Sequence, residues 1–148
     1  MLVRCLYASR IPKTQSAATL NNILESSRKN NTKHGITGVL VATSDSFIQV
    51  LEGGRAQVSA TYNAICQDKR HSDVTMLSFD EIAHRSFEGW SMGEVTIGQL
   101  NPSVLLKHSA SLYIDPFVMS GAAVLAMLKD VVASGTVVCG NATRSKRG

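Results

Sequence analysis

Residues 36–54 read ITGVLVATSDSFIQVLEGG, two apolar segments around a short polar turn, and they decide the fold. The first segment, residues 36–43, is rich in β-branched side chains and predicts a strand. Ser44-Asp45-Ser46 predicts a hairpin turn, and the second strand runs from Phe47 until Gly53-Gly54 ends it. The chain therefore contains a β-hairpin around which its other elements can be placed.

Gln49 is the unusual residue of this hairpin, because its primary amide lies within the apolar run 47–51. Alternate residues of a strand face alternate sides, so Phe47, Gln49 and Leu51 share one face. A buried amide without hydrogen-bond partners costs about 1–3 kcal/mol. Either the protein satisfies it, as for most buried polar groups, or a polar ligand does. The strand alone leaves both interpretations open.

Apolar periodicity predicts the elements that flank the hairpin. In order they are a strand at 2–8, a helix at 14–29, a loop at 30–35, the hairpin strands, a helix carrying Val58, Thr61, Tyr62 and Ile65 that ends near 68–71, and strands at 74–82 and 93–97. The order βαββαββ predicts an α+β, ferredoxin-like sheet with both helices on one face and with parallel, neighbouring first and third strands. Tyr7 and Gln49 would then point into the same space beneath the helices.

A different region follows Asn101-Pro102. It predicts helices at 104–112 and 116–134, the second started by Asp115-Pro116 and stopped by Gly135. The wide apolar surface of the second helix must cover the bare sheet face, meet another subunit, or both. We therefore expect a domain at 1–98, a helical extension at 99–135 on the other face of the sheet, and a flexible basic tail at 136–148.

Composition limits the class of protein. The chain has 148 residues, of which 44% are hydrophobic and 18% charged, as expected for one compact domain with a short extension. Cys5, Cys66 and Cys139 have no zinc-finger or C-x-x-C spacing, which predicts a reducing compartment, the cytoplasm, and no metal site. The apolar stretch 117–128 is shorter than the roughly 20 residues of a membrane span, so no membrane is expected.

The common catalytic patterns are missing from the sequence. No glycine-rich loop matches a phosphate-binding fingerprint, and no Ser or Cys is spaced from a histidine as in a known triad. Asp80 and Glu81 are adjacent, so they point to opposite faces of a strand. The net charge of +4 permits nucleic-acid binding, but aromatic residues make up only 5%, too few for a stacking platform. We expect no enzyme and no nucleic-acid partner.

What remains is a set of neutral polar groups around an apolar space. They are Tyr7, Ser27, Asn30, Asn31 and Gln49, with Trp90 and Met92 just before the last strand. Such groups recognise a heteroaromatic edge, for example a flavin or pterin ring, and they suit a redox-active tyrosine. Taken singly, each also fits an ordinary role in the core or in a turn, and Lys69, Arg70 and His71 fit helix capping.

Several separated motifs together resemble one family. They are Tyr7, the loop Asn30-Asn31-x-x-x-Gly35-Ile36-Thr37-Gly38, the run Phe47-Ile48-Gln49-Val50-Leu51-Glu52-Gly53, the segment Asp68-Lys69-Arg70-His71, and Trp90-Ser91-Met92. In order and spacing, over residues 1–98, they resemble the BLUF family, sensors of blue light using flavin adenine dinucleotide. The extension to residue 148 resembles the short members, whose extra helices lie on the sheet face away from the flavin.

The resemblance implies a cofactor and a site. The cofactor would be FAD, with FMN and riboflavin as substitutes. Its ring would lie between the first two helices, with Asn31 on its polar edge, Gln49 at N5 and the C4 carbonyl, and Tyr7 bonded to Gln49. Apolar walls would come from Ile23, Phe47 and Ile65, and the remaining contacts from Ser27, Lys29, Asn30, Asp68, Arg70 and His71. At Ala64 some relatives carry a basic residue, which implies fewer phosphate contacts here.

The resemblance also implies a mechanism. Blue light would make the flavin a strong oxidant, Tyr7 would donate an electron, and Gln49 would relay the proton. Gln49 would then stay rotated or tautomerised, which shifts the absorption to the red. Trp90 and Met92 would pass the change to the last strand, to a homo-oligomer interface or to a downstream signalling protein. Which of the two lies nearer the flavin stays open.

Two other classes of function remain. A ferredoxin-like nucleic-acid-binding module would use the basic charge, but it should expose aromatic residues on an open sheet face. A small acylphosphatase-like hydrolase could use an arginine and an asparagine, although no anion-binding loop follows the first strand in sequence.

Overall fold

The computed structural model of the chain describes residues 1–12, 17–96, 98, 100–135 and 137. Its elements are β1 (Leu2–Arg10), α1 (Ala17–His34), β2 (Thr37–Ala42), β3 (Ser46–Gly54), α2 (Arg55–Cys66), β4 (Ser72–Ile82), β5 (Gly93–Thr96), α3 (Pro102–His108) and α4 (Gly121–Ala133). This is the expected βαββαββ order with two further helices. The expected helix start at Thr14, the strand end at Ile97 and, apart from Val137, the tail at 136–148 lie outside the described residues.

The strands form one sheet in the order β4-β1-β3-β2-β5. β3 is antiparallel to both β1 and β2, and β5 runs parallel to β2. The prediction that the first and third strands are neighbours is confirmed, but the prediction that they are parallel is wrong. Helix α1 carries the chain back so that β2 runs in the direction of β1, and the hairpin turn then reverses β3 against both.

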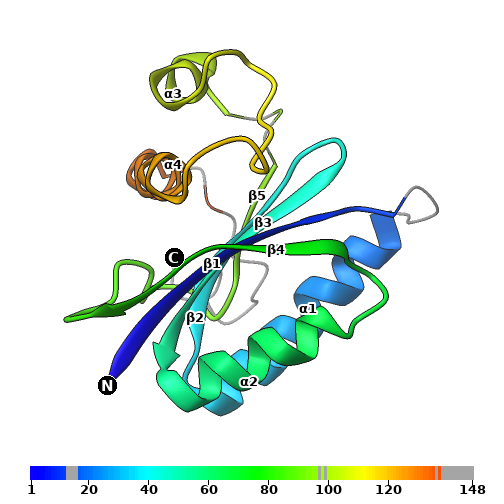
Figure 1. Ribbon diagram of the computed structural model, residues 1–148, viewed down its shortest axis with the longest axis vertical. Coiled ribbons are helices and arrows are strands. Elements are labelled where there is room, and N and C mark those ends of the chain that lie inside the picture. Colours follow the sequence, from blue (N-terminus) through cyan, green and yellow to red (C-terminus); the bar gives the residue numbers. More distant parts are fainter. Residues whose placement is uncertain (13–16, 97, 99, 136, 138–148) are drawn as a thin grey trace.

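Helices cover both faces of the sheet (Figure 1). Helices α1 and α2 lie on one face, over a core that includes Tyr7, Leu40 and Leu51. Helices α3 and α4 lie on the other face, over a second core that includes Leu6 and Val50. The apolar surface expected on the last helix therefore covers the sheet, through the buried α4 residues Val124, Met127, Leu128 and Val131.

Helix α1 is longer than predicted, because residues 30–34 continue it instead of forming a loop. Gly35 ends the helix with a positive φ of 69°, which glycine adopts without strain. The Ile36 amide then donates back to the Asn31 carbonyl at 2.9 Å, as in a Schellman motif. The turn-forming residues are thus explained by the end of the helix, and Asn30 and Asn31 are held on a rigid element.

The C-terminal helices are shorter than predicted. Asn101 caps α3 by accepting from the Ser103 amide at 3.0 Å, and the helix ends at His108 instead of residue 112. The last helix was expected to start at Pro116 but starts at Gly121, because the Ser120 hydroxyl accepts from the Ala123 amide at 3.1 Å. Asp115 instead accepts from the Phe117 amide at 3.1 Å, in a turn before the helix.

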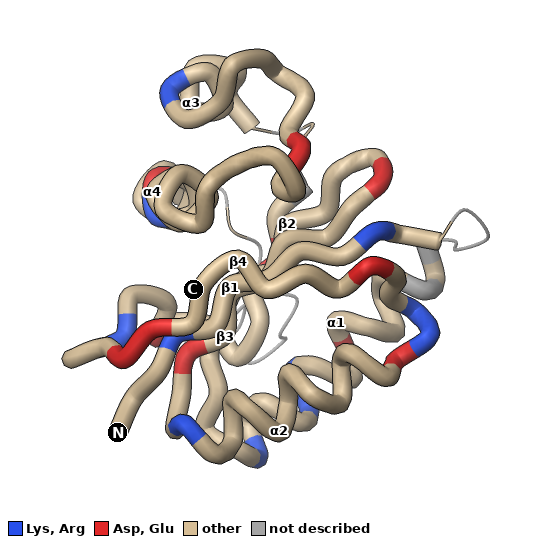
Figure 2. Tube along the Cα trace, viewed as in Figure 1, with Lys and Arg blue, Asp and Glu red and all other residues tan. Residues whose placement is uncertain are grey.

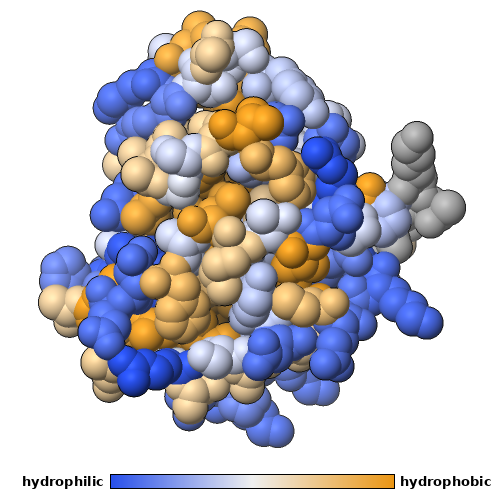
Figure 3. All heavy atoms as spheres, viewed as in Figure 1, coloured by the Kyte–Doolittle hydropathy of each residue, from blue (hydrophilic) through white to orange (hydrophobic). Residues whose placement is uncertain are grey.

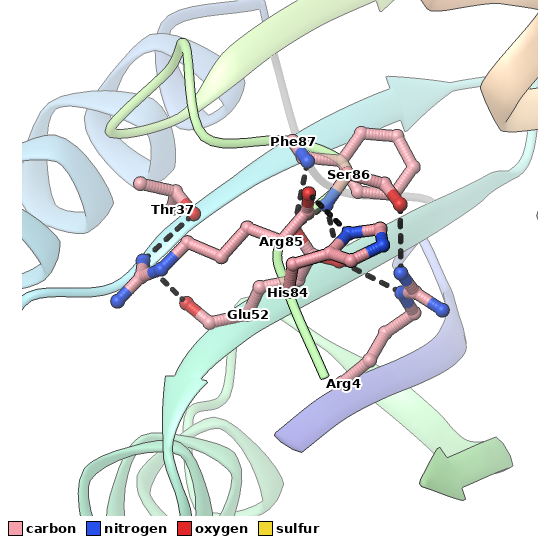
Figure 4. Close-up of polar contacts among 7 residues, drawn as sticks. All are labelled: Arg4, Thr37, Glu52, His84, Arg85, Ser86 and Phe87. Carbon is pink, nitrogen blue, oxygen red and sulfur yellow. Dashed lines mark hydrogen bonds and ion pairs between the residues drawn. The ribbon is translucent and has the colours of Figure 1, made fainter. Parts of the chain in front are cut away.

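A buried ion pair anchors the connection between β4 and β5 (Figure 4). Glu52 on β3 is fully buried and accepts from Arg4 Nε at 2.8 Å. The same carboxylate accepts from the Ser86 and Phe87 amides at 2.8 and 2.7 Å. Arg85 donates to the Glu52 carbonyl, to the Gly35 carbonyl and to the Thr37 hydroxyl. This Glu52 anchor fixes the segment that leads to Trp90 and Met92.

Charged residues are spread over the loops, the helices and the strands (Figure 2). Apolar side chains reach the surface between the two helix layers (Figure 3), and Met76 and Phe79 of the edge strand β4 are exposed. Among the described residues, no helix is both long enough and apolar enough to cross a bilayer.

Candidate functional site

A cavity of about 480 Å³ lies on the α1 and α2 side of the sheet. Helix α1 contributes one face, with residues at helical spacing, and α2 contributes the facing wall. The floor comes from β3 through Gln49 and Leu51. The lining residues are Ile23, Ser26, Ser27, Asn30, Asn31, His34, Gln49, Leu51, Ala56, Gln57, Ala60, Thr61, Ala64, Ile65, Asp68, Arg70 and His71.

Gln49 is held between two side chains at the floor of this cavity. Tyr7 stands directly opposite Gln49 in the pairing of β1 and β3, and its hydroxyl donates to Gln49 Oε1. On the other side, Gln49 Nε2 donates to Met92 Sδ at 3.2 Å. A primary amide has two N–H groups and two oxygen lone pairs. One donor and one acceptor position of Gln49 therefore remain for a ligand in the cavity.

Tyr7 is fully buried, and desolvation raises the pKa of its phenol well above the usual value. The edge of the Tyr62 ring approaches it with centroids 5.6 Å apart. Burial and a hydrogen bond with Cys66 raise the pKa of Tyr62 to about 12. Both phenols keep their protons at neutral pH, so Tyr7 is a hydrogen-bond donor to Gln49.

Met92 and Trp90 lie in different cores. Met92 is fully buried on the cavity side with Tyr7, whereas Trp90 packs against the core under α4. Residue 90 is therefore on the far side of the sheet from Gln49. Of the two residues, Met92 is therefore the one that contacts Gln49.

Asn31 is buried at the wall of the cavity, and its Nδ2 donates to the Ser91 carbonyl at 2.8 Å. Its Oδ1 is left to accept from a ligand. Ile23, Ser27 and Asn30 also line the cavity from α1, as expected. Lys29 does not: it is exposed and outside the lining, because one further residue turns the helix by about 100°.

Asp68, Arg70 and His71 form one polar corner of the cavity. Arg70 donates to both Asp68 oxygens at 2.6 to 3.0 Å, and this contact lowers the pKa of Asp68. His71 Nδ1 lies 2.8 Å from the Ser9 hydroxyl, and burial lowers the pKa of its imidazole. The Arg70 charge is thus already balanced by a carboxylate, which weakens it as a phosphate partner.

The family profile described as sensors of blue light using FAD matches residues 2–93. The chain belongs to this BLUF family. It is 32% identical over 87 residues to the blue light- and temperature-regulated antirepressor BluF of Escherichia coli K12, covering 59% of this chain and 22% of that protein. It is 30% identical over 96 residues to the photoactivated adenylate cyclase subunit beta of Euglena gracilis, covering 64% of this chain and 11% of that one.

Solved structures of BLUF proteins superpose on this structure over most of the chain. The photo-activated state of BlsA matches with a TM-score of 0.80 and 28% identity, covering 89% of this chain and 95% of that one. The dark state of BlrB matches with a TM-score of 0.75 and 28% identity, covering 90% and 96%. The expected ferredoxin-like α+β class is thereby confirmed.

The family membership makes this chain a blue-light sensor that uses FAD. The nucleic-acid module and the hydrolase receive no support from these relatives. The chain spans only about a fifth of BluF and a tenth of the cyclase subunit. Their names describe proteins that are much longer than the matched region.

The donor set of the cavity fits the flavin of a BLUF protein. Ile23, Leu51 and Ile65 offer apolar surface to a planar ring, and Asn31 Oδ1 and the Gln49 amide offer polar groups at its edge. Phe47 was expected as an apolar wall of the ring, but it lies behind the lining, against His71. Tyr7 also lies behind the lining and bonds to Gln49, which is the contact that the resemblance implies. Ala64 lines the cavity with no group that reaches a phosphate.

Residues of α2 that line the cavity were missed in the sequence. Gln57, Ala60 and Thr61 lie on one face together with Ala64, the position already expected near the phosphates. Their spacing of three and four residues was visible, but Thr61 was assigned to the apolar stripe and the small residues carried no polar signal. Arg28 was also missed, although its Nε donates to the Met92 carbonyl at 3.0 Å.

Proposed function

We propose that Tyr7, Gln49 and Met92 are the switch of this light sensor. The supporting observation is the position of the Gln49 amide, which lies between the Tyr7 hydroxyl, Met92 Sδ and the cavity. Each bonding state of a buried amide is well defined, because exchanging a partner inside a low-dielectric site has a large free-energy effect. Gln49 can therefore hold two distinct arrangements.

Bound flavin supplies a chromophore that absorbs blue light and is a strong oxidant when excited. Tyr7 would donate an electron to the bound flavin, and its hydroxyl proton would pass along the hydrogen bond to Gln49 Oε1, from which Gln49 would relay it to the flavin. The electron and the proton would later return to Tyr7. After the proton returns, Gln49 is rotated or tautomerised. An amide rotated by half a turn presents its Nε2 to Tyr7 and its Oε1 to Met92, so the hydrogen bond to Met92 Sδ is lost.

Asn31 and Gln49 would hold the polar edge of the ring, with Ile23, Leu51 and Ile65 on its faces. Ser27, Asn30, Asp68, Arg70 and His71 would surround the ribityl and phosphate chain. Because Arg70 is paired with Asp68, we propose that FMN and riboflavin also bind. BlrP1 of Klebsiella pneumoniae, another protein of similar structure, has been solved with FMN.

The experiment is absorption spectroscopy of the flavin-loaded protein before and after blue light. A reversible red shift is expected in the wild type and is expected to vanish in Tyr7→Phe and Gln49→Ala. Both variants should still carry flavin, since neither change removes the apolar walls of the cavity. A normal red-shifted photoproduct in either loaded variant would exclude this switch.

We further propose that residues 1–98 are the flavin-binding domain, that 99–135 are the extension that carries the signal, and that the receiver is a downstream protein or a homo-oligomer. The antirepressor and the cyclase subunit support this, because in both the matched region is a small part of a regulated protein. Light scattering of the protein in the dark and under blue light tests the oligomer. The cytoplasm is the proposed location, supported by the free thiols of Cys5 and Cys66.

A further inference from the structure

Three consecutive peptide carbonyls before β5 each accept a hydrogen bond from outside their own segment. The Trp90 carbonyl accepts from the Gly38 amide at 3.0 Å, and the Ser91 carbonyl accepts from Asn31 Nδ2 at 2.8 Å. The Met92 carbonyl accepts from Arg28 Nε at 3.0 Å. We call Arg28, Asn31 and Gly38 the carbonyl clamp.

The segment needs such a clamp because it has no regular structure of its own. Residues 90–92 lie in a bend between the Glu52 anchor and the first residue of β5. A methionine side chain is flexible, so packing alone specifies the position of its sulfur poorly. Holding the Met92 carbonyl fixes the origin of that side chain and hence the distance between Met92 Sδ and Gln49.

Arg28 and Asn31 are one helical turn apart on α1, but only one of them lines the cavity. Asn31 lines the cavity, whereas Arg28 is not part of the lining. Arg28 contributes a charged donor, which makes a stronger hydrogen bond than a neutral one. Changing Arg28 therefore removes a hold on Met92 without removing a flavin contact, which separates positioning from ligand binding.

We propose that Arg28 is a positioning residue, which holds Met92 at Gln49 and keeps Trp90 in the opposite core in the dark. This inference rests on the proposed switch, because it assigns Arg28 to one state of that switch. When Gln49 releases Met92 Sδ, the three hydrogen bonds of the clamp still resist movement of residues 90–92. Arg28 thus sets how far a change at Gln49 is passed to β5.

Hydrogen–deuterium exchange of the flavin-loaded protein in the dark tests this inference. In Arg28→Gln, the peptide that contains residues 90–96 is expected to exchange about tenfold faster than in the wild type, since a charged hydrogen bond is lost. Peptides from β1 and β3 should be unchanged. Lys33→Gln is the matched control, because it removes an exposed positive charge from the same helix and should exchange as the wild type does.

The single tryptophan provides a second readout. The emission of Trp90 is expected to shift to longer wavelength in Arg28→Gln and to stay unchanged in Lys33→Gln. Arg28→Lys keeps the charge but has a different donor geometry, so it should change both the exchange rate and the emission less than Arg28→Gln does. It replaces Arg28→Gln in the test if that variant folds poorly. Exchange within twofold of the wild type, or equally faster exchange in β1 and β3, would overturn the inference.

Hydrogen–deuterium exchange under blue light distinguishes a failure of this inference from a failure of the proposed switch. Blue light should speed exchange of residues 90–96 in the wild type and should add less in Arg28→Gln, where the segment is already released. If the wild type lacks the red shift, the switch fails, while the dark exchange of Arg28→Gln still decides whether Arg28 positions Met92.

Discussion

Tyr7 and Gln49 are direct cross-strand partners in β1 and β3, and the Tyr7 hydroxyl donates to the Gln49 side-chain oxygen. The antiparallel pairing brings the two Cβ atoms close together on one face of the sheet. Backbone register therefore positions the proposed electron donor next to the proposed proton relay. Side-chain flexibility has little effect on this contact, since both residues are buried.

Tyr7→Phe tests this contact through the unfolding free energy as well as through the absorption spectrum. The ring should still fit, but Gln49 Oε1 loses its donor, which costs about 1–3 kcal/mol of unfolding free energy. Urea denaturation of the flavin-loaded wild type and variant measures this difference in unfolding free energy. Tyr113→Phe is the control, because its hydroxyl bonds to Asp45 at the surface and should contribute much less to the unfolding free energy. Equal costs in the two variants would contradict the buried role of Tyr7.

Asn31→Asp should weaken flavin binding about tenfold or more, because a carboxylate cannot donate to the Ser91 carbonyl and it adds charge to the cavity wall. Fluorescence titration of the apo-protein with riboflavin measures the affinity without a phosphate contribution. Asn63→Asp on the exposed side of α2 is the matched control and should bind as the wild type does. Unchanged affinity in Asn31→Asp would remove Asn31 from the proposed flavin site.

Glu52→Gln should destabilise the fold by about 3–5 kcal/mol, since it leaves Arg4 buried without a counter-charge. It also weakens the acceptor of the Ser86 and Phe87 amides. Glu81→Gln is the comparison, because the Arg55–Glu81 pair is exposed and should contribute less than about 1 kcal/mol. Chemical denaturation at neutral pH measures the loss of unfolding free energy in both variants. Similar losses in Glu52→Gln and Glu81→Gln would show that the Glu52 anchor is not a stabilising element.

His71 should make stability fall as the pH is lowered. Burial lowers the pKa of His71, and the nearby Asp68 opposes this only in part. In the unfolded chain the pKa is near 6.5, so the unfolded state takes up the proton first. The stabilisation is complete above about pH 6.5 and is lost as the pH falls from there toward the lower pKa of the folded state.

The measurement for His71 is the unfolding free energy at pH 5, 6, 7 and 8. The slope between pH 7 and 5 should be reduced in His71→Gln and retained in His84→Gln, where the histidine is exposed. An unchanged slope in His71→Gln would mean that other groups cause the pH dependence.

The pattern of apolar and polar residues along the chain determined most of the secondary structure of this protein. Alternation and helical spacing predicted the order of the elements, and the buried amide of Gln49 singled out the site. Two local predictions were wrong because a different residue from the one expected capped the helix. Residues 30–34 were predicted as a loop, yet Gly35 ended a longer helix there, and Ser120 capped the last helix in place of Asp115.

Only the tertiary structure decided which side chains meet. Trp90 and Met92 are two residues apart, which in a strand would place them on one face, but they lie in a bend and enter different cores. Arg70 was expected to cap a helix or to contact the flavin, whereas in the fold Asp68 pairs with it. Arg28 carried no signal in the sequence. Sequence patterns report the environment of each residue along its own element, whereas partners from distant elements depend on how those elements pack.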